Sequence, residues 1–183
     1  MNRSNVDIIR TDFGGTLAVG DRDDALHAIQ DGRGYDMVVF TAREVPPPPQ
    51  ALRVRNRVRR PVRMYYVPLL DADLSDGERM ALAQAVPIFA TMFRYGTAVR
   101  RAENQRGGRI LITCNKGVNR SALVTALVLD EVYGCGGEEA MRTVKLRRVV
   151  GKRALENPHF VHFLKQIPPR PHGVRRLTSE IAL

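Results

Sequence analysis

A cysteine and an arginine six positions apart could together handle a phosphoryl group. The five-residue segment between Cys114 and Arg120 consists of Asn115, Lys116, Gly117, Val118 and Asn119. In a tight loop, the backbone N–H groups of such a segment can all point at one tetrahedral anion, and a glycine permits a positive backbone φ. The spacing therefore predicts a phosphate-binding loop formed by residues 115–120.

The predicted loop also contains the groups needed for covalent catalysis. N–H donors and the N-terminus of a following helix favour thiolate over thiol, so Cys114 can act as a nucleophile at neutral pH. Arg120 can hold two phosphoryl oxygens with its planar guanidinium, a geometry that lysine cannot reproduce. Ser121 follows directly, and its hydroxyl can donate to the sulfur and ease the departure of the sulfur in a second step.

Four short segments are predicted to be strands. Each is apolar or β-branched over the length of a strand: residues 16–20, 35–41, 64–68 and 110–112. The last lies just before Cys114 and is of the type buried in the middle of a parallel sheet. Arginines alternate with other residues through 53–59, which predicts a basic stripe on an extended segment. Both a solvated edge and a substrate-docking face are consistent with this stripe.

Five segments are predicted to be helices. Ser75 and Glu78 form the pattern of a capping box at the start of a long helix, which Pro87 can kink and a glycine pair at 107–108 ends. The other helices are expected at residues 24–29, 121–133, 138–148 and 157–166. Strands that alternate with helices predict an α/β fold, in which a central, partly parallel mixed sheet is flanked by helices.

The length and composition fit a single domain. The 183 residues are 44% hydrophobic and contain no long flexible linker. We expect one domain over residues 1–183, with a core at about 7–167 and frayed termini. No apolar run is long enough to span a membrane, and no signal peptide is recognisable. A cytoplasmic protein is therefore expected.

The charge of the chain favours an anionic partner. The formal net charge is +10, which fits a phosphorylated protein or another phosphate substrate. Nucleic acid is a less favoured partner, because G+C-rich coding alone could produce the excess of arginine. No metal or cofactor is expected, since His159 and His162 fit a packed or surface pair better than zinc ligands. Cys135 is expected to be a small residue at a helix end, with a regulatory disulfide to Cys114 as the alternative.

The segment around Cys114 resembles the signature His-Cys-x-x-Gly-x-x-Arg-Ser of the protein tyrosine and dual-specificity phosphatases. Residues 17–20 are similar to the early Leu-Tyr-Leu-Gly element of that family, and 66–71 to its Ile-Pro-x-x-Asp segment. Residues 139–148 and 157–160 are similar to features that follow the loop. The resemblance covers about residues 16–166. It implies a fold like that of the dual-specificity phosphatases and a phosphocysteine intermediate.

The resemblance also implies a general acid. Asp71 matches the family's carboxylic acid, which protonates the leaving oxygen and then acts as base toward water. Asp73 is the alternative, and either side chain could instead cap the following helix. Thr113 is the one clear departure, because the family usually has a histidine there that supports the loop and the thiolate from behind. The hydroxyl of Thr113 can still hydrogen-bond the loop.

Three functions fit these observations. The first is metal-free hydrolysis of phosphate monoesters on phosphotyrosine, extending to phosphoserine and phosphothreonine. The second is removal of phosphate from RNA 5′ ends or phosphoinositides, which the arginine excess suggests. The third is a phosphate-binding module without turnover, which Thr113 suggests. We favour the first, because nucleophile, phosphate clamp and acid are all present in the sequence.

Overall fold

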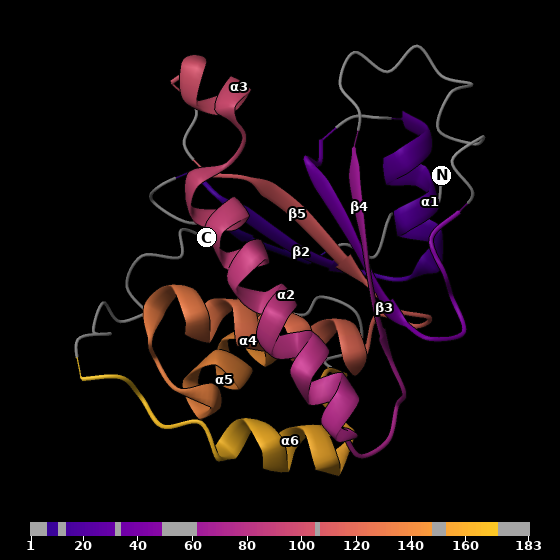
Figure 1. Ribbon diagram of the computed structural model, residues 1–183, viewed down its shortest axis with the longest axis vertical. Coiled ribbons are helices and arrows are strands. Elements are labelled where there is room, and N and C mark those ends of the chain that lie inside the picture. Colours follow the sequence, from indigo (N-terminus) through magenta and orange to yellow (C-terminus); the bar gives the residue numbers. More distant parts are fainter. Residues whose placement is uncertain are drawn as a thin grey trace.

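A five-stranded mixed sheet forms the centre of the computed structural model (Figure 1). The structure describes residues 7–10, 14–31, 34–48, 62–104, 107–147 and 153–171. The strands are β1 (Asp7–Arg10), β2 (Thr16–Gly20), β3 (Met37–Ala42), β4 (Arg63–Leu69) and β5 (Arg109–Thr113). The helices are α1 (Arg22–Asp31), α2 (Asp76–Tyr95), α3 (Ala98–Ala102), α4 (Arg120–Tyr133), α5 (Gly137–Arg147) and α6 (Pro158–Lys165). The predicted α/β fold with a partly parallel sheet is confirmed.

The order of the strands places β5 in the middle of the sheet. The order is β1-β2-β5-β3-β4, in which β1 is antiparallel to β2 and the other neighbours are parallel. Thr113, the last residue of β5, pairs with Gly20 of β2 and with Phe40 of β3. Parallel strands end at the same edge of a sheet, so the loops that follow β2, β3, β4 and β5 come together there.

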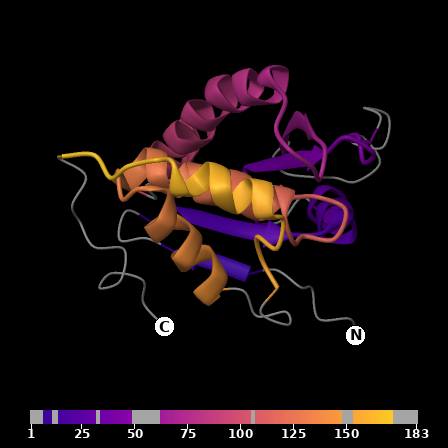
Figure 2. The ribbon, with the colours of Figure 1, turned by 90° about the horizontal axis from the view of Figure 1, so that it is seen from below.

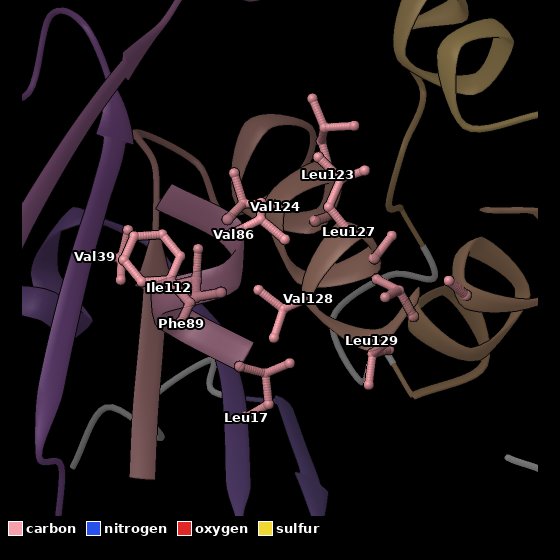
Figure 3. Packing of buried hydrophobic residues seen from close by; sticks show 14 of the residues in the cluster. Leu17, Val39, Val86, Phe89, Ile112, Leu123, Val124, Leu127, Val128 and Leu129 are labelled. Carbon is pink, nitrogen blue, oxygen red and sulfur yellow. The ribbon is translucent and has the colours of Figure 1, made fainter. Parts of the chain in front are cut away.

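Hydrophobic residues hold the sheet between two layers of helices. On one face, Ile112 of β5 belongs to the same cluster as Phe89 of α2 and Val128 of α4 (Figure 3). On the other face, Leu111 belongs to a cluster with Ile29 of α1. Helices α5 and α6 pack beside α4 (Figure 2). β5 is therefore covered on both sides, as its uninterrupted apolar sequence predicts.

Local sequence signals determine several helix ends. Glu78 N–H donates to the Ser75 hydroxyl, and the Glu78 carboxylate accepts from the Ser75 N–H, which confirms the capping box at the start of α2. Helix α4 ends at Gly134, which has a left-handed φ of 62°. Helix α2 is a single helix of 20 residues that continues past Pro87.

Some segments differ from what the sequence predicts, and others lie outside the described residues. The sequence does not predict β1, which has only four residues. The long helix expected to end at the glycine pair 107–108 ends instead at Tyr95, where Gly96 follows with a φ of 63°, and α3 is a separate helix of five residues. The predicted basic stripe at 53–59 lies outside the described residues, as does the N-terminal segment 1–6. Residues 166–171, which follow α6, form no helix or strand, and Arg170 pairs there with Glu131 of α4 at 2.7 Å. Within the described ranges, no helix combines the length and apolar character needed to cross a membrane.

Candidate active site

Contacts between four loops build the candidate site at the carboxyl edge of the sheet. The loop after β5 holds Cys114 and leads into α4. Its Gly117 has a φ of +65°, and a Cβ there would lie 2.9 Å from the carbonyl oxygen of Gly20, at the end of β2. The loops after β3 and β4 approach the same place through contacts with Arg120 and Asn119. The predicted positive φ at Gly117 is confirmed, and only glycine satisfies both its conformation and its packing.

The thiol of Cys114 lies at the base of the loop. The side chain is buried, and its Sγ accepts a hydrogen bond from Gly117 N–H at 3.1 Å. The hydroxyl oxygen of Ser121, which is also buried, lies 3.3 Å from the same sulfur. Both neighbours can donate to a thiolate, and α4 starts at the end of the loop. The structure thus brings Cys114 and Ser121 together as the sequence predicts.

Arg120 is the first residue of α4 and is 6% exposed. Its Nη1 donates to Glu44 Oε2 at 2.6 Å, and its Nη2 donates to Glu44 Oε1 at 2.5 Å. Nη1 also donates to the carbonyl oxygen of Leu69 at 3.2 Å. Among buried side-chain nitrogen and oxygen atoms of the described residues, Arg120 Nε alone has no hydrogen-bond partner.

The pairing with Glu44 uses only one edge of the guanidinium. A guanidinium carries five N–H groups, and Glu44 and Leu69 accept three of them at the end of the side chain. The Nε–H and the second N–H of Nη2 lie along the other edge. Two parallel donors of this kind form a fork that can bind two oxygens of one anion.

Glu44 is a site residue that the sequence analysis missed. It lies just after β3, 76 positions before Arg120, and no local pattern links the two. The hydrogen bond from Arg120 lowers the pKa of Glu44, although burial acts in the opposite direction. The stabilisation from this pair is therefore present at neutral pH and is lost as the pH falls through the lowered pKa. Glu44 orients the guanidinium and remains ionised while it does so.

Asp71 lies beside the Cys114 loop, whereas Asp73 points to a different partner. One carboxylate oxygen of Asp71 accepts from Asn119 Nδ2 at 3.1 Å, and the other accepts from Asn157 Nδ2 at 3.0 Å. Asp73 is 3.7 Å from Arg79 of α2, and its side chain is 69% exposed. Of the two alternatives, Asp71 has the position that a proton donor at the loop requires.

The N-terminus of α4 is not capped by its own N-cap residue. Asn119 makes no side-chain hydrogen bond to the first turn of α4, although asparagine is a preferred cap. Its Oδ1 instead accepts from the N–H groups of Glu156 and Asn157 at 2.8 and 3.2 Å. The first turn of α4 therefore receives no oxygen from Asn119, and a helix end of this kind favours an anion.

The remaining loop residues differ in exposure. Asn115 and Lys116 are exposed, and Val118 is half-buried. The carbonyl oxygen of Val118 accepts from Leu155 N–H at 3.1 Å, which ties the loop to the segment before α6. The loop is thus held from both the Gly20 side and the Leu155 side, which keeps its N–H groups in place.

Solved structures of phosphatases match the chain over most of its length. Human DUSP28 is 27% identical, with a TM-score of 0.57, over 86% of this chain and 90% of that chain. The chain has the dual-specificity phosphatase fold. The Yvh1 phosphatase domain of Chaetomium thermophilum matches at 19% identity and a TM-score of 0.60 over 86% and 93% of the two chains. Tk-PTP in its active form matches at 20% identity and a TM-score of 0.56, over 88% of this chain and 94% of that chain.

The resemblance seen in the sequence is confirmed by these phosphatase structures. No protein-family model matches the sequence, and no curated protein sequence matches it. The relationship is therefore visible mainly in the backbone, where a phosphatase fold is retained at low sequence identity.

Thr113 occupies the position at which this phosphatase family usually has histidine. Its hydroxyl donates to the carbonyl oxygen of Val39 at 3.2 Å, and its own carbonyl oxygen accepts from the Thr41 hydroxyl at 2.8 Å. Both threonines are buried. The hydroxyl of Thr113 therefore binds β3 and not the loop, contrary to our expectation. The start of the loop is instead supported by the pairing of β3 with β5 and by the hydrogen bonds of the two threonine hydroxyls.

The second cysteine and the two histidines have hydrogen-bond partners outside the Cys114 loop. Cys135 follows α4 and packs against the core, where burial, the largest cause, raises its pKa to about 12. Both cysteines are free thiols. His162 shares a hydrogen bond with Gln166 at 2.9 Å, and His159 N–H donates to Asn157 Oδ1. Within the ranges that the structure describes, no group of three or more His, Cys, Asp and Glu side chains could hold a metal ion.

Glu44→Gln is expected to lower kcat/KM for an aryl phosphate by about 10- to 100-fold, because a misplaced catalytic group costs on that order. The amide nitrogen of glutamine cannot accept from Arg120, so the guanidinium loses its two-point support. Glu139→Gln is the matched control, since Glu139 makes a similar two-point pair with Arg142 on α5. Steady-state kinetics of both variants provide the measurement. Equal activity of Glu44→Gln and the control contradicts a role for Glu44 in orienting Arg120.

Proposed function

We propose that the protein is a cysteine-dependent phosphatase that hydrolyses phosphate monoesters through a phosphocysteine intermediate. The observation that carries this proposal is the unpaired Nε of buried Arg120. A buried donor without a partner costs about 1–3 kcal/mol, and more when the group is charged. An oxyanion bound beside Cys114 would satisfy this donor together with the second N–H of Nη2.

The contacts of Cys114 support its role as nucleophile. The sulfur would attack phosphorus and form an S–P bond, while the bond from phosphorus to the leaving oxygen breaks. The loop N–H groups and Arg120 would hold the equatorial oxygens of the phosphoryl group during this transfer. In this step Asp71 would give its proton to the leaving oxygen.

The second step would release phosphate and restore the thiolate. Asp71, now a carboxylate, would take a proton from water as the water attacks the phosphocysteine, and the S–P bond would break. The Ser121 hydroxyl, 3.3 Å from the sulfur, would donate to the departing thiolate. No cofactor takes part in either step.

The proposed substrates are phosphorylated proteins, with phosphotyrosine as the first candidate and phosphoserine and phosphothreonine as further candidates. The fold shared with human DUSP28 and the basic charge of +10 support an anionic phosphate substrate. A panel that contains phosphopeptides, 5′-triphosphorylated RNA and phosphoinositides tests this choice. Faster turnover of RNA or phosphoinositide than of every phosphopeptide contradicts it.

Arg120→Lys tests the proposal, because it removes the Nε on which the proposal rests. We expect kcat/KM for an aryl phosphate to fall by about 10²- to 10³-fold, as for the loss of a donor to a developing oxyanion. A lysine ammonium is a point charge and cannot pair with Glu44 while presenting two parallel donors to phosphate. Arg142→Lys changes an exposed arginine on α5 and is the matched control. Near-normal efficiency of Arg120→Lys contradicts a phosphate clamp at this position.

A further inference from the structure

Two asparagine amides hold the carboxylate of Asp71 from different parts of the chain. Asn119 belongs to the Cys114 loop, and Asn157 is the N-cap of α6. Their Nδ2 atoms lie 3.1 and 3.0 Å from the two oxygens of Asp71. Asp71 is exposed, so packing does not fix the carboxylate. Its direction depends on these two hydrogen bonds.

Backbone groups determine which way each amide faces. Asn157 Oδ1 accepts from His159 N–H at 2.9 Å, and Asn119 Oδ1 accepts from the N–H groups of Glu156 and Asn157. A backbone N–H can only donate, so the atom that faces it must be the amide oxygen. The NH2 group of each asparagine is therefore directed at Asp71. Asn157 is also buried, which restricts its rotation further.

We propose that Asn119 and Asn157 are positioning residues that hold the carboxyl group of Asp71 at the leaving-group side of the Cys114 loop. This inference rests on the proposed function, in which Asp71 is the proton donor. A carboxylate offers about four acceptor sites, and the two amides occupy two of them. The remaining sites can carry the proton that Asp71 gives to the leaving oxygen and, in the second step, can accept from water.

The two hydrogen bonds to Asp71 also link three segments: the Cys114 loop, the loop that holds Asp71, and the start of α6. Asn119 connects the phosphate-binding loop to the acid, and Asn157 connects the acid to the start of α6. A displacement of about 1 Å in such a group can cost about 10²-fold in rate. Loss of one amide is therefore expected to slow the proton transfer and to leave phosphate binding by Arg120 unchanged.

Asn157→Asp separates the positioning role from the capping role. The new carboxylate can still accept from His159 N–H, so α6 keeps its cap. It can no longer donate to Asp71 and instead places an oxygen against an oxygen. We expect kcat for an alkyl phosphate to fall by about 10- to 100-fold. We expect KM, and kcat for an ester of an acidic phenol, to change by less than about threefold.

Two further variants provide controls. Asn157→Ser keeps an oxygen for the cap but adds no charge, and the same dependence on the leaving group is expected. Asn104→Asp makes the identical chemical change at an exposed position between α3 and β5. Helix α3 lies near the start of β5, at the opposite end of that strand from the Cys114 loop (Figure 1). We expect Asn104→Asp to leave kcat unchanged for both the alkyl phosphate and the ester of an acidic phenol.

A double-mutant cycle gives the decisive measurement. If Asn157 acts through Asp71, then Asn157→Asp has almost no further effect in the Asp71→Asn background. Additive effects of the two substitutions overturn the inference, as does an equal loss on both substrates. If Asp71→Asn depends on the leaving group and Asn157→Asp does not, the inference fails and the proposed function stands. If the wild-type protein shows no turnover, both fail, because Asp71 then has no proton to deliver.

Discussion

Cys114→Ser is expected to abolish turnover while inorganic phosphate still binds. The substitution keeps the size of the side chain, the loop N–H groups and the unpaired edge of Arg120. A serine hydroxyl is not ionised at neutral pH and has no base beside it, so the nucleophile is lost. We expect the rate with an aryl phosphate to fall by at least about 10⁴-fold, as for removal of a covalent nucleophile elsewhere. Steady-state kinetics and calorimetric titration with phosphate provide the two measurements.

The second cysteine is the matched control for this experiment. Cys135 lies between α4 and α5, and its pKa is raised to about 12. It is therefore a neutral thiol in the assay, and Cys135→Ser is expected to retain full activity. Turnover by Cys114→Ser at the wild-type rate would contradict the covalent mechanism. Phosphate binding without turnover by the wild-type protein would instead favour the binding module that Thr113 suggested.

Much of the fold could be predicted because its signals are local. The capping box of Ser75 and Glu78 and the left-handed Gly134 are pairs or single residues that act within one turn of helix. Cys114, Gly117 and Ser121 lie within eight residues of one another, so their spacing alone predicts a shared loop. Short elements such as β1 carry too few residues to show a period.

The residues that the sequence analysis missed act over long sequence separations. Glu44 and Arg120 are 76 positions apart, and Asp71 and Asn157 are 86 positions apart. Glu44 and Arg120 meet because β3 and β5 are parallel neighbours, whose following loops lie at one edge of the sheet. Asn157 reaches Asp71 because the segment before α6 packs on the Cys114 loop, where Leu155 N–H donates to the carbonyl oxygen of Val118. Glutamate after a strand and asparagine before a helix are common in solvent-exposed turns, so neither residue type signals a site.

The choice between Asp71 and Asp73 illustrates the same limit. Both carboxylates lie in the loop before α2, and both could cap that helix by sequence alone. The structure shows that Ser75 caps α2, which removes the capping role from both. The direction of each side chain then distinguishes them, because Asp73 lies near Arg79 and Asp71 contacts the loop through Asn119.

Asp71→Asn is expected to lower the rate by about 10²- to 10⁴-fold on alkyl phosphates, the usual size of general acid catalysis. An alkoxide is a poor leaving group and needs the proton that an asparagine cannot supply. The phenolate of an acidic phenol leaves without much help. The rate on esters of such phenols should therefore fall far less. A series of phosphate esters with leaving groups of increasing acidity measures this dependence. The wild-type rates should vary weakly across the series, and the variant rates steeply.

Asp73→Asn is the matched control, because it makes the same change two positions along the same loop. Its carboxylate lies beside Arg79 and not at the Cys114 loop, so the slope across the ester series should equal that of the wild type. A steep slope for Asp73→Asn and a weak one for Asp71→Asn would mean that the match to the family's acid segment is displaced by two residues. A weak slope for both variants would mean that the proton comes from another group, and that the Asn119 and Asn157 contacts hold Asp71 for a structural reason alone.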